Sequence, residues 1–196
     1  MPVKSIRRLA LCSLFLGGLL LSGCQRPVVN QPLTGTLGGN DPDTQLEFWH
    51  QLADRPVTSN DEAFHGLLLY LDGEPTAGDY AARVQALKSR GILPASFDEP
   101  GEQAVSRGTL ALAVVRALEI KGGLMMSLMP DNPRYAVREL VYLNLFPQSS
   151  PNQTFSGGEF LGIVGRMEDW QRSNPLEQKE LPLEPASPAV EGAPGS

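Results

Sequence analysis

The side chains best able to do chemistry in this 196-residue sequence are two histidines and two cysteines, His50, His65, Cys12 and Cys24. His50 stands beside Trp49, which favours a packed or half-exposed imidazole, and His65 is expected to point sideways or towards solvent. The sequence contains no Ser/His/Asp order with a nucleophile turn, no HExxH motif and no Walker loop, and its carboxylates lack the spacing of an acid/base pair. We therefore expect a protein that is not an enzyme and that uses neither a metal nor a cofactor.

Cys24 closes an apolar run, residues 9–23, that follows a basic N-terminal start. A basic start, an apolar run of about a dozen residues and a small-residue cleavage site are typical of a secretory signal. The run is too short and too rich in glycine to span a bilayer comfortably. Its end, Leu21-Ser22-Gly23-Cys24, resembles the lipobox of bacterial lipoproteins. The resemblance implies that residues 1–23 are a lipoprotein signal peptide and that Cys24 carries acyl chains such as palmitate.

The charge of the processed chain limits its partners. Loss of Lys4, Arg7 and Arg8 with the signal lowers the number of Lys and Arg from 16 to 13, against 22 Asp and Glu, which gives a formal charge of −9. An acidic chain is a poor ligand for nucleic acid, so we expect no nucleic-acid partner and expect membrane attachment through the acyl chains on Cys24. Residue 25 is Gln rather than Asp, which resembles outer-membrane lipoproteins of Gram-negative bacteria and implies a location facing the periplasm.

Two flanking stretches lack the apolar periodicity that could bury a core. Residues 24–43 are rich in Pro, Gly and Asn and are expected to form a flexible tether. Residues 172–196 contain five prolines and few large apolar residues, which predicts a disordered, Pro-rich tail. The stretch between them, residues 44–171, has the length of one ordinary domain.

Within that domain, three serines open apolar helical runs at intervals of 47 and 50 residues: Ser59, Ser106 and Ser156. The first and third are followed three residues later by glutamate, which predicts a capping box at each helix start. The second has Thr109 at that position. Apolar residues at offsets 4, 5 and 8 from each serine indicate helices with one face turned towards a core.

Each capped run is preceded by a second predicted helix, at residues 44–53, 79–90 and 134–146. The unit is thus helix, loop and capped helix, repeated three times. A period of about 40 to 50 residues is typical of a repeat architecture. The predicted fold class is all-α, with three helix-loop-helix repeats.

The middle unit resembles an S-layer homology repeat. The resemblance rests on the helix end Leu87–Leu93, with its Gly-Ile turn, and on Val105-Ser106-Arg107 at the start of the next helix. It implies three repeats packed as a pseudo-threefold helical bundle, whose grooves bind cell-wall polysaccharide or peptidoglycan-linked polymer. The family's polymer-binding arginine falls on Arg107, whereas Asn60 and Gly157 occupy the same position in the other two units.

Two groups of side chains are candidates for polymer binding. Arg107, Arg134 and Arg138 offer hydrogen bonds to an anionic or hydroxyl-rich polymer. Tyr80 and Tyr135, with Trp49, offer flat faces that stack on sugar rings, although such aromatics also serve to fill a core.

The methionine-rich segment 124–129 has two interpretations. We expect it to pack beneath a connection, and an adaptable surface for a partner is the alternative.

These observations predict a non-catalytic, lipid-anchored envelope protein that binds cell-wall polymer. The alternative is a periplasmic scaffold or assembly lipoprotein that binds another envelope protein through its helical repeats.

Overall fold

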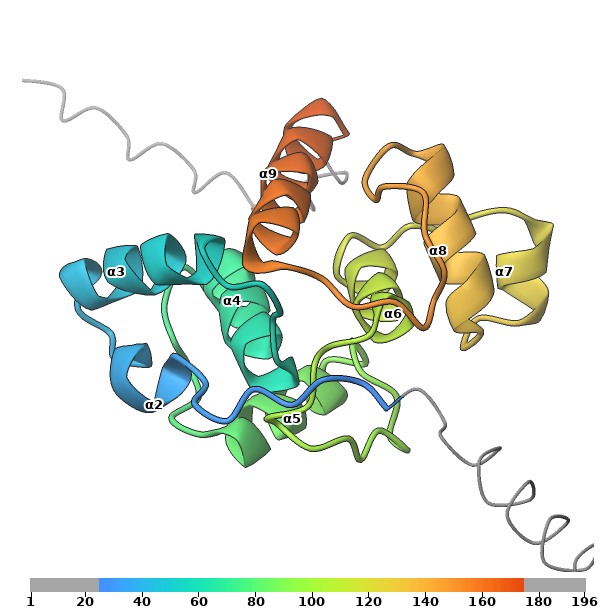
Figure 1. The fold of residues 1–196 in the computed structure, drawn as a ribbon. Helices are drawn as coiled ribbons and strands as arrows, with labels where there is room; N and C mark the ends of the chain where they lie inside the picture. Colours follow the sequence, from blue (N-terminus) through green and yellow to red (C-terminus); the bar gives the residue numbers. More distant parts are fainter. Residues whose placement is uncertain (1–24, 175–196) are drawn as a thin grey trace, which may run out of the picture.

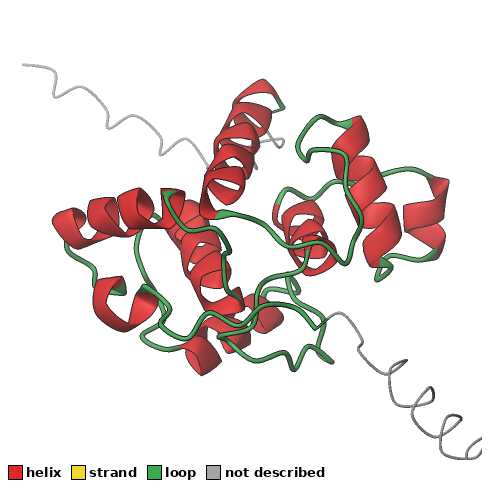
Figure 2. Ribbon diagram, in the orientation of Figure 1, coloured by secondary structure: helices red, strands yellow, loops and turns green. Residues whose placement is uncertain are grey.

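The computed structural model describes residues 25–174, which form eight helices and no strand within that span (Figures 1 and 2). The all-α prediction is confirmed. The predicted signal peptide, Cys24 and residues 175–196 of the predicted tail lie outside the described residues. Between residues 25 and 174, no helix has both the length and the apolar content needed to cross a membrane.

Six of the helices form three consecutive pairs, each with a leading helix and a capped helix, as predicted. The pairs are α3 (Pro42–Ala53) with α4 (Asn60–Asp72), α5 (Tyr80–Ser89) with α6 (Arg107–Ala117), and α8 (Pro133–Tyr142) with α9 (Gly157–Ser173). Two short helices, α2 (Thr34–Leu37) and α7 (Leu124–Leu128), precede the first and third pairs. Helix α9 continues to Ser173, two residues beyond the predicted end of the domain.

The predicted helix 134–146 ends earlier than expected. Helix α8 stops at Tyr142 because Asn144 adopts a left-handed backbone, with φ of 59°. The amide of Leu145 then donates to the carbonyl oxygen of Leu140, which closes the helix end. Asparagine tolerates this conformation better than most residues.

The three serine caps form as predicted. The hydroxyl oxygens of Ser59 and Ser156 accept from the amides of Glu62 and Glu159, and each glutamate carboxylate accepts from the amide of its serine. Both capping boxes are therefore complete. At the second helix, Ser106 accepts from the amide of Thr109 at 3.0 Å.

The three units are joined by backbone hydrogen bonds in cyclic order. The amide of Asn60 donates to the carbonyl of Gln103, that of Arg107 donates to Gln153, and that of Gly157 donates to Arg55. In each case the first residue of a capped helix donates to the loop before the cap of the next unit. The first amides of a helix have no acceptor inside that helix. Each unit therefore supplies the carbonyl that accepts from the first helical amide of a neighbouring unit. This ring gives the bundle its pseudo-threefold arrangement.

The core is a single cluster of buried residues to which all three capped helices contribute. The predicted apolar positions at offsets 4, 5 and 8 are all buried except Leu161, which is half-buried. Four phenylalanines are among the largest fully buried side chains: Phe48, Phe64, Phe155 and Phe160. Helix α4 is buried on all sides from Asn60 to Leu69, because other elements cover its whole circumference.

The predicted tether, residues 24–43, is wrong for the greater part of its length. Leu33 and Thr34 are buried, and the Leu33 amide donates to the carboxylate of Glu62 at 3.0 Å. Further upstream, the carbonyl of Pro27 accepts from the amide of Ala104 at 2.8 Å. The prolines and glycines of this stretch are typical of a linker, but its backbone is held by hydrogen bonds to residues far along the chain. The folded domain therefore starts near residue 26 rather than at residue 44.

The predictions for both histidines are also corrected. His50 is exposed, whereas His65 is only 1 % exposed and its ring packs edge-on against Phe48, with 4.6 Å between the ring centroids. Burial, with a smaller contribution from Arg83, lowers the pKa of His65 to about 4.

This burial makes stability depend on pH. Between pH 6.5 and pH 4 the unfolded chain protonates its histidine while the folded protein resists protonation, so folding stability falls as the pH falls. We expect the contribution of His65 to reach about 3 kcal/mol of destabilisation by pH 4. Urea unfolding at a series of pH values measures it, with His65→Leu as the control. A parent and variant whose stabilities change in parallel between pH 6.5 and pH 4 would contradict this expectation.

Candidate functional site

Arg107, the residue that the repeat resemblance marks for polymer binding, is committed to contacts within the fold. It is 7 % exposed, and its guanidinium lies 2.6 Å from the carboxylate of Glu159. The guanidinium carbon also lies 4.5 Å from the ring centroid of Phe155, in a cation–π contact. Burial opposes ionisation of Glu159, but hydrogen bonds from Ser156 and Arg107 outweigh it and lower the pKa of that carboxyl. Arg107 thus joins the second unit to the third.

The remaining predicted binding residues do not form one site with Arg107. The Tyr80 hydroxyl donates to the carbonyl of Glu99 at 2.6 Å, and its ring stacks on Phe64. Burial raises the pKa of Tyr80 above its ordinary value. Arg134 is exposed at the start of α8. Tyr135 and Arg138, further along α8, share a hollow against α7. The structure therefore brings together only the residues on α8.

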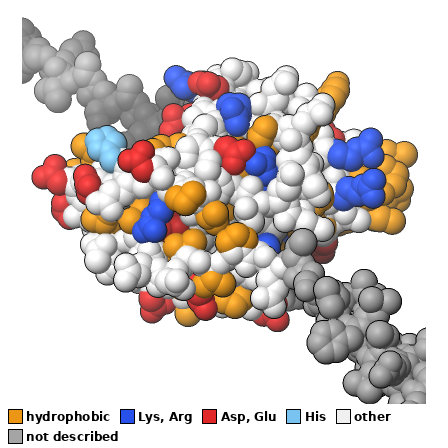
Figure 3. Space-filling model, viewed as in Figure 1, with side chains coloured by type: hydrophobic (Ala, Val, Ile, Leu, Met, Phe, Trp, Pro, Cys, Tyr) orange, Lys and Arg blue, Asp and Glu red, His pale blue; other side chains and the backbone are white. Residues whose placement is uncertain are grey.

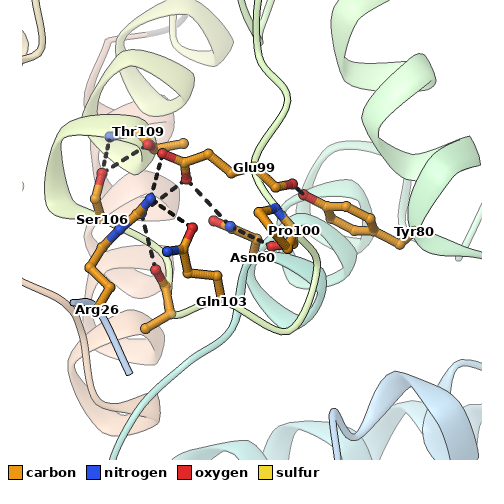
Figure 4. Close-up of polar contacts among 9 residues, drawn as sticks. Arg26, Asn60, Tyr80, Glu99, Pro100, Gln103, Ser106 and Thr109 are labelled. Carbon is orange, nitrogen blue, oxygen red and sulfur yellow. Dashed lines mark hydrogen bonds and ion pairs between the residues drawn. The ribbon is translucent and has the colours of Figure 1, made fainter. Parts of the chain in front are cut away.

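The chain enters the domain through an arginine that sequence reasoning assigned to the tether. The guanidinium of Arg26 makes an ion pair with Glu99 at 2.6 Å and donates to the side-chain oxygen of Gln103 at 2.9 Å (Figure 4). Asn60 donates to the carbonyl of Pro100 at 2.9 Å in the same network. A positive charge in a Pro-rich stretch gave no sign of its partners, which lie more than seventy residues away. The network fixes the first described residues to the first and second units.

A groove suited to a ligand lies between α3, α4 and α9; we call it the α3–α9 groove. It has a volume of about 550 Å³, and its lining residues are Gln45, Trp49, Leu69, Tyr70, Leu161, Val164, Gly165, Glu168 and Gln171. The volume falls in the range of small-molecule sites, about 300–1,000 Å³. Trp49 is held by a stacked contact with Phe160, at 6.5 Å between the rings, which fixes the orientation of the indole.

The polar groups of this groove come from two helices. Within residues 25–174, the buried hydroxyl of Tyr70 on α4 has no hydrogen-bond partner. Burial and the nearby Glu168 raise the pKa of Tyr70 to about 12, so the phenol keeps its proton at neutral pH. Glu168 and Gln171 are exposed on α9 and add an acceptor and an amide. Sequence reasoning singled out Trp49 but missed Tyr70, because only the fold places α4 beside α9.

The α3–α9 groove combines an aromatic wall with hydroxyl, amide and carboxylate groups. This combination suits a neutral, polyhydroxylated ligand, since sugar rings pack on aromatic faces and exchange hydrogen bonds with polar rims. In the part of the chain that the structure describes, no group of three or more His, Cys, Asp or Glu side chains is arranged to hold a metal. Comparisons with family models, with curated protein sequences and with solved structures give no match to this chain.

Proposed function

We propose that this protein is a non-catalytic lipoprotein of the bacterial outer membrane, facing the periplasm, whose helical domain binds cell-wall polysaccharide or peptidoglycan. The lipobox resemblance at Cys24 supports the anchor. The α3–α9 groove is the proposed polymer site, in place of Arg107, whose guanidinium is engaged by Glu159 and Phe155.

The observation that carries this proposal is the unpartnered Tyr70 hydroxyl in a groove that is also lined by Trp49. A buried donor without a partner costs about 1–3 kcal/mol, and a ligand hydroxyl that opens the groove wall enough to accept from it removes that cost. The neighbouring indole supplies apolar contact for the face of a sugar ring. A glycan provides both chemistries in one chain.

Gly165 offers a direct way to close the groove without disturbing the core. It lies in the middle of α9 and lines the groove, and a Cβ at this position has no atom within 4 Å. We expect Gly165→Leu to occupy the groove and abolish most binding to purified peptidoglycan sacculi. The helix itself gains about 0.5–1 kcal/mol, because glycine is a poor helix former. Sedimentation with sacculi measures binding, and thermal unfolding measures stability.

Gly162→Leu is the matched control. Gly162 is exposed on the same helix outside the groove, and its Cβ meets only Arg166 at ordinary distances. This variant is expected to bind sacculi like the parent, whereas Tyr70→Phe is expected to bind more weakly. Undiminished binding by folded Gly165→Leu protein would remove the groove as the site.

A further inference from the structure

The surface around α7 concentrates the large apolar side chains that the described residues expose. Five of the seven such side chains lie there, between 44 and 80 % exposed: Leu124, Met125, Leu128, Met129 and Tyr142. We call these five residues the apolar face. Figure 1 shows α7 at one edge of the molecule, opposite α3, and Figure 3 shows apolar side chains gathered at that edge. The expectation that segment 124–129 packs beneath a connection is therefore wrong, apart from Met126, which is buried.

Basic and aromatic side chains border the apolar face. Arg134, Arg138 and Tyr142 follow one another at intervals of four on α8, so they share one side of that helix, and all three are exposed. Arg138 lines a hollow with Leu124, Met125 and Tyr142, which places its charge at the edge of the apolar face. Figure 3 shows Lys and Arg side chains beside the apolar ones. Leucine and methionine flanked by arginine and tyrosine is the pattern of a surface that lies in a membrane interface.

Carboxylates near this surface are largely engaged within the protein. Asp131 pairs with Arg116, and the carboxylate of Glu139 accepts from the amide of Gly123. The chain as a whole is acidic, but the border of the apolar face is locally basic.

The N-terminal entry point lies near the start of α8, the helix that carries Tyr142 at its other end. Arg26 is fixed by Glu99, and it lines a groove of about 510 Å³ together with Pro133, the first residue of α8. Cys24 stands two residues before Arg26. Two extended residues reach about 7 Å at most, so an acyl chain on Cys24 holds this part of the domain against the bilayer.

We propose that the apolar face rests in the interface of the bilayer that holds the acyl chains, as a second membrane contact that orients the domain. The inference rests on the proposed acylation of Cys24. The α3–α9 groove then lies away from the membrane, because α3 is at the opposite edge of the molecule from α7 (Figure 1). The domain then has a fixed orientation on the membrane, with its proposed polymer groove directed towards the periplasm.

Single-cysteine labelling tests this contact, because processing is expected to leave Cys24 as the only native cysteine, with its thiol blocked by lipid. The full acylated chain carrying Leu128→Cys is labelled with an environment-sensitive fluorophore. It is then reconstituted in vesicles of phosphatidylethanolamine and phosphatidylglycerol that contain brominated acyl chains. We expect the label at Leu128 to lose most of its fluorescence by quenching. Gln51→Cys, on an exposed turn of α3, is the matched control and is expected to keep its fluorescence.

Equal, weak quenching at both positions overturns the proposal. If the label at position 128 is shielded from water only when a vesicle holds several protein molecules, the apolar face contacts a second copy of the chain and the proposal is overturned. If the label is exposed to water in pure lipid vesicles but shielded in native membranes, the apolar face contacts a protein partner and the proposal is likewise overturned. Mass spectrometry of Cys24 in the same samples shows separately whether the anchor itself is present, so failure of the anchor and failure of the contact are distinguished.

Discussion

Replacing Gly157 by alanine is expected to destabilise the folded domain by more than about 3 kcal/mol, a large share of the 5–15 kcal/mol that such domains possess. The added Cβ would lie 1.5 Å from the carbonyl oxygen of Leu52 and 2.6 Å from its carbonyl carbon. Both are backbone atoms at the end of α3, so no side chain can rotate away. The start of α9 must instead move from α3, which also strains the hydrogen bond from the Gly157 amide to Arg55 at 2.9 Å.

Gly158→Ala is the matched control one residue further along α9. Its Cβ would meet the carbonyl oxygen of Ala53 at 3.5 Å, which is an ordinary contact. We expect this variant to match the parent or to gain up to about 1 kcal/mol from the better helix former. Urea unfolding followed by circular dichroism compares the two. Similar stabilities for both variants would mean that α3 and α9 can separate at little cost, contrary to the close approach in the structure.

The parts of the fold that the sequence predicted are those with local causes. Ser59 and Ser156 bond to groups three residues away, so their capping boxes are legible in a short stretch of sequence. The apolar stripe of each capped helix is similarly local. The apolar spacing led to a wrong prediction only on α4, where His65 lies beside the apolar positions and is nevertheless buried. Its burial depends on α3, whose Phe48 covers it, and no spacing within α4 reveals that.

The parts that the sequence could not predict depend on distant partners. Arg26 and Leu33 stand among prolines and glycines, and their contacts with Glu99 and Glu62 hold a stretch of linker-like composition in the fold. Arg107 was expected to face a ligand, but the cyclic order of the units places Glu159 against it. The α3–α9 groove has the same origin, since Trp49 and Tyr70 meet α9 only after the ring of units has closed.

Removing the positive charge of Arg83 is expected to cost about 3–5 kcal/mol, because it leaves the Asp61 carboxylate poorly compensated in the interior. Arg83 is 2 % exposed, and two of its nitrogens, Nε and Nη2, lie 2.8 Å from one oxygen of Asp61. The other oxygen of Asp61 accepts from the hydroxyl of Thr34. One carboxylate thus ties α5 to α4 and to the N-terminal segment.

A double-mutant cycle measures this coupling. Arg83→Met and Asp61→Leu are each expected to be strongly destabilising, while the double variant is expected to recover much of the loss because no charge is left buried without a partner. Additive losses in the double variant would show that the two side chains act independently. Hydrogen exchange adds a second readout, since the amide of Leu33 is bonded to Glu62 beside this pair. We expect faster exchange at Leu33 in Arg83→Met, because the N-terminal segment is held through the hydrogen bond from Thr34 to Asp61.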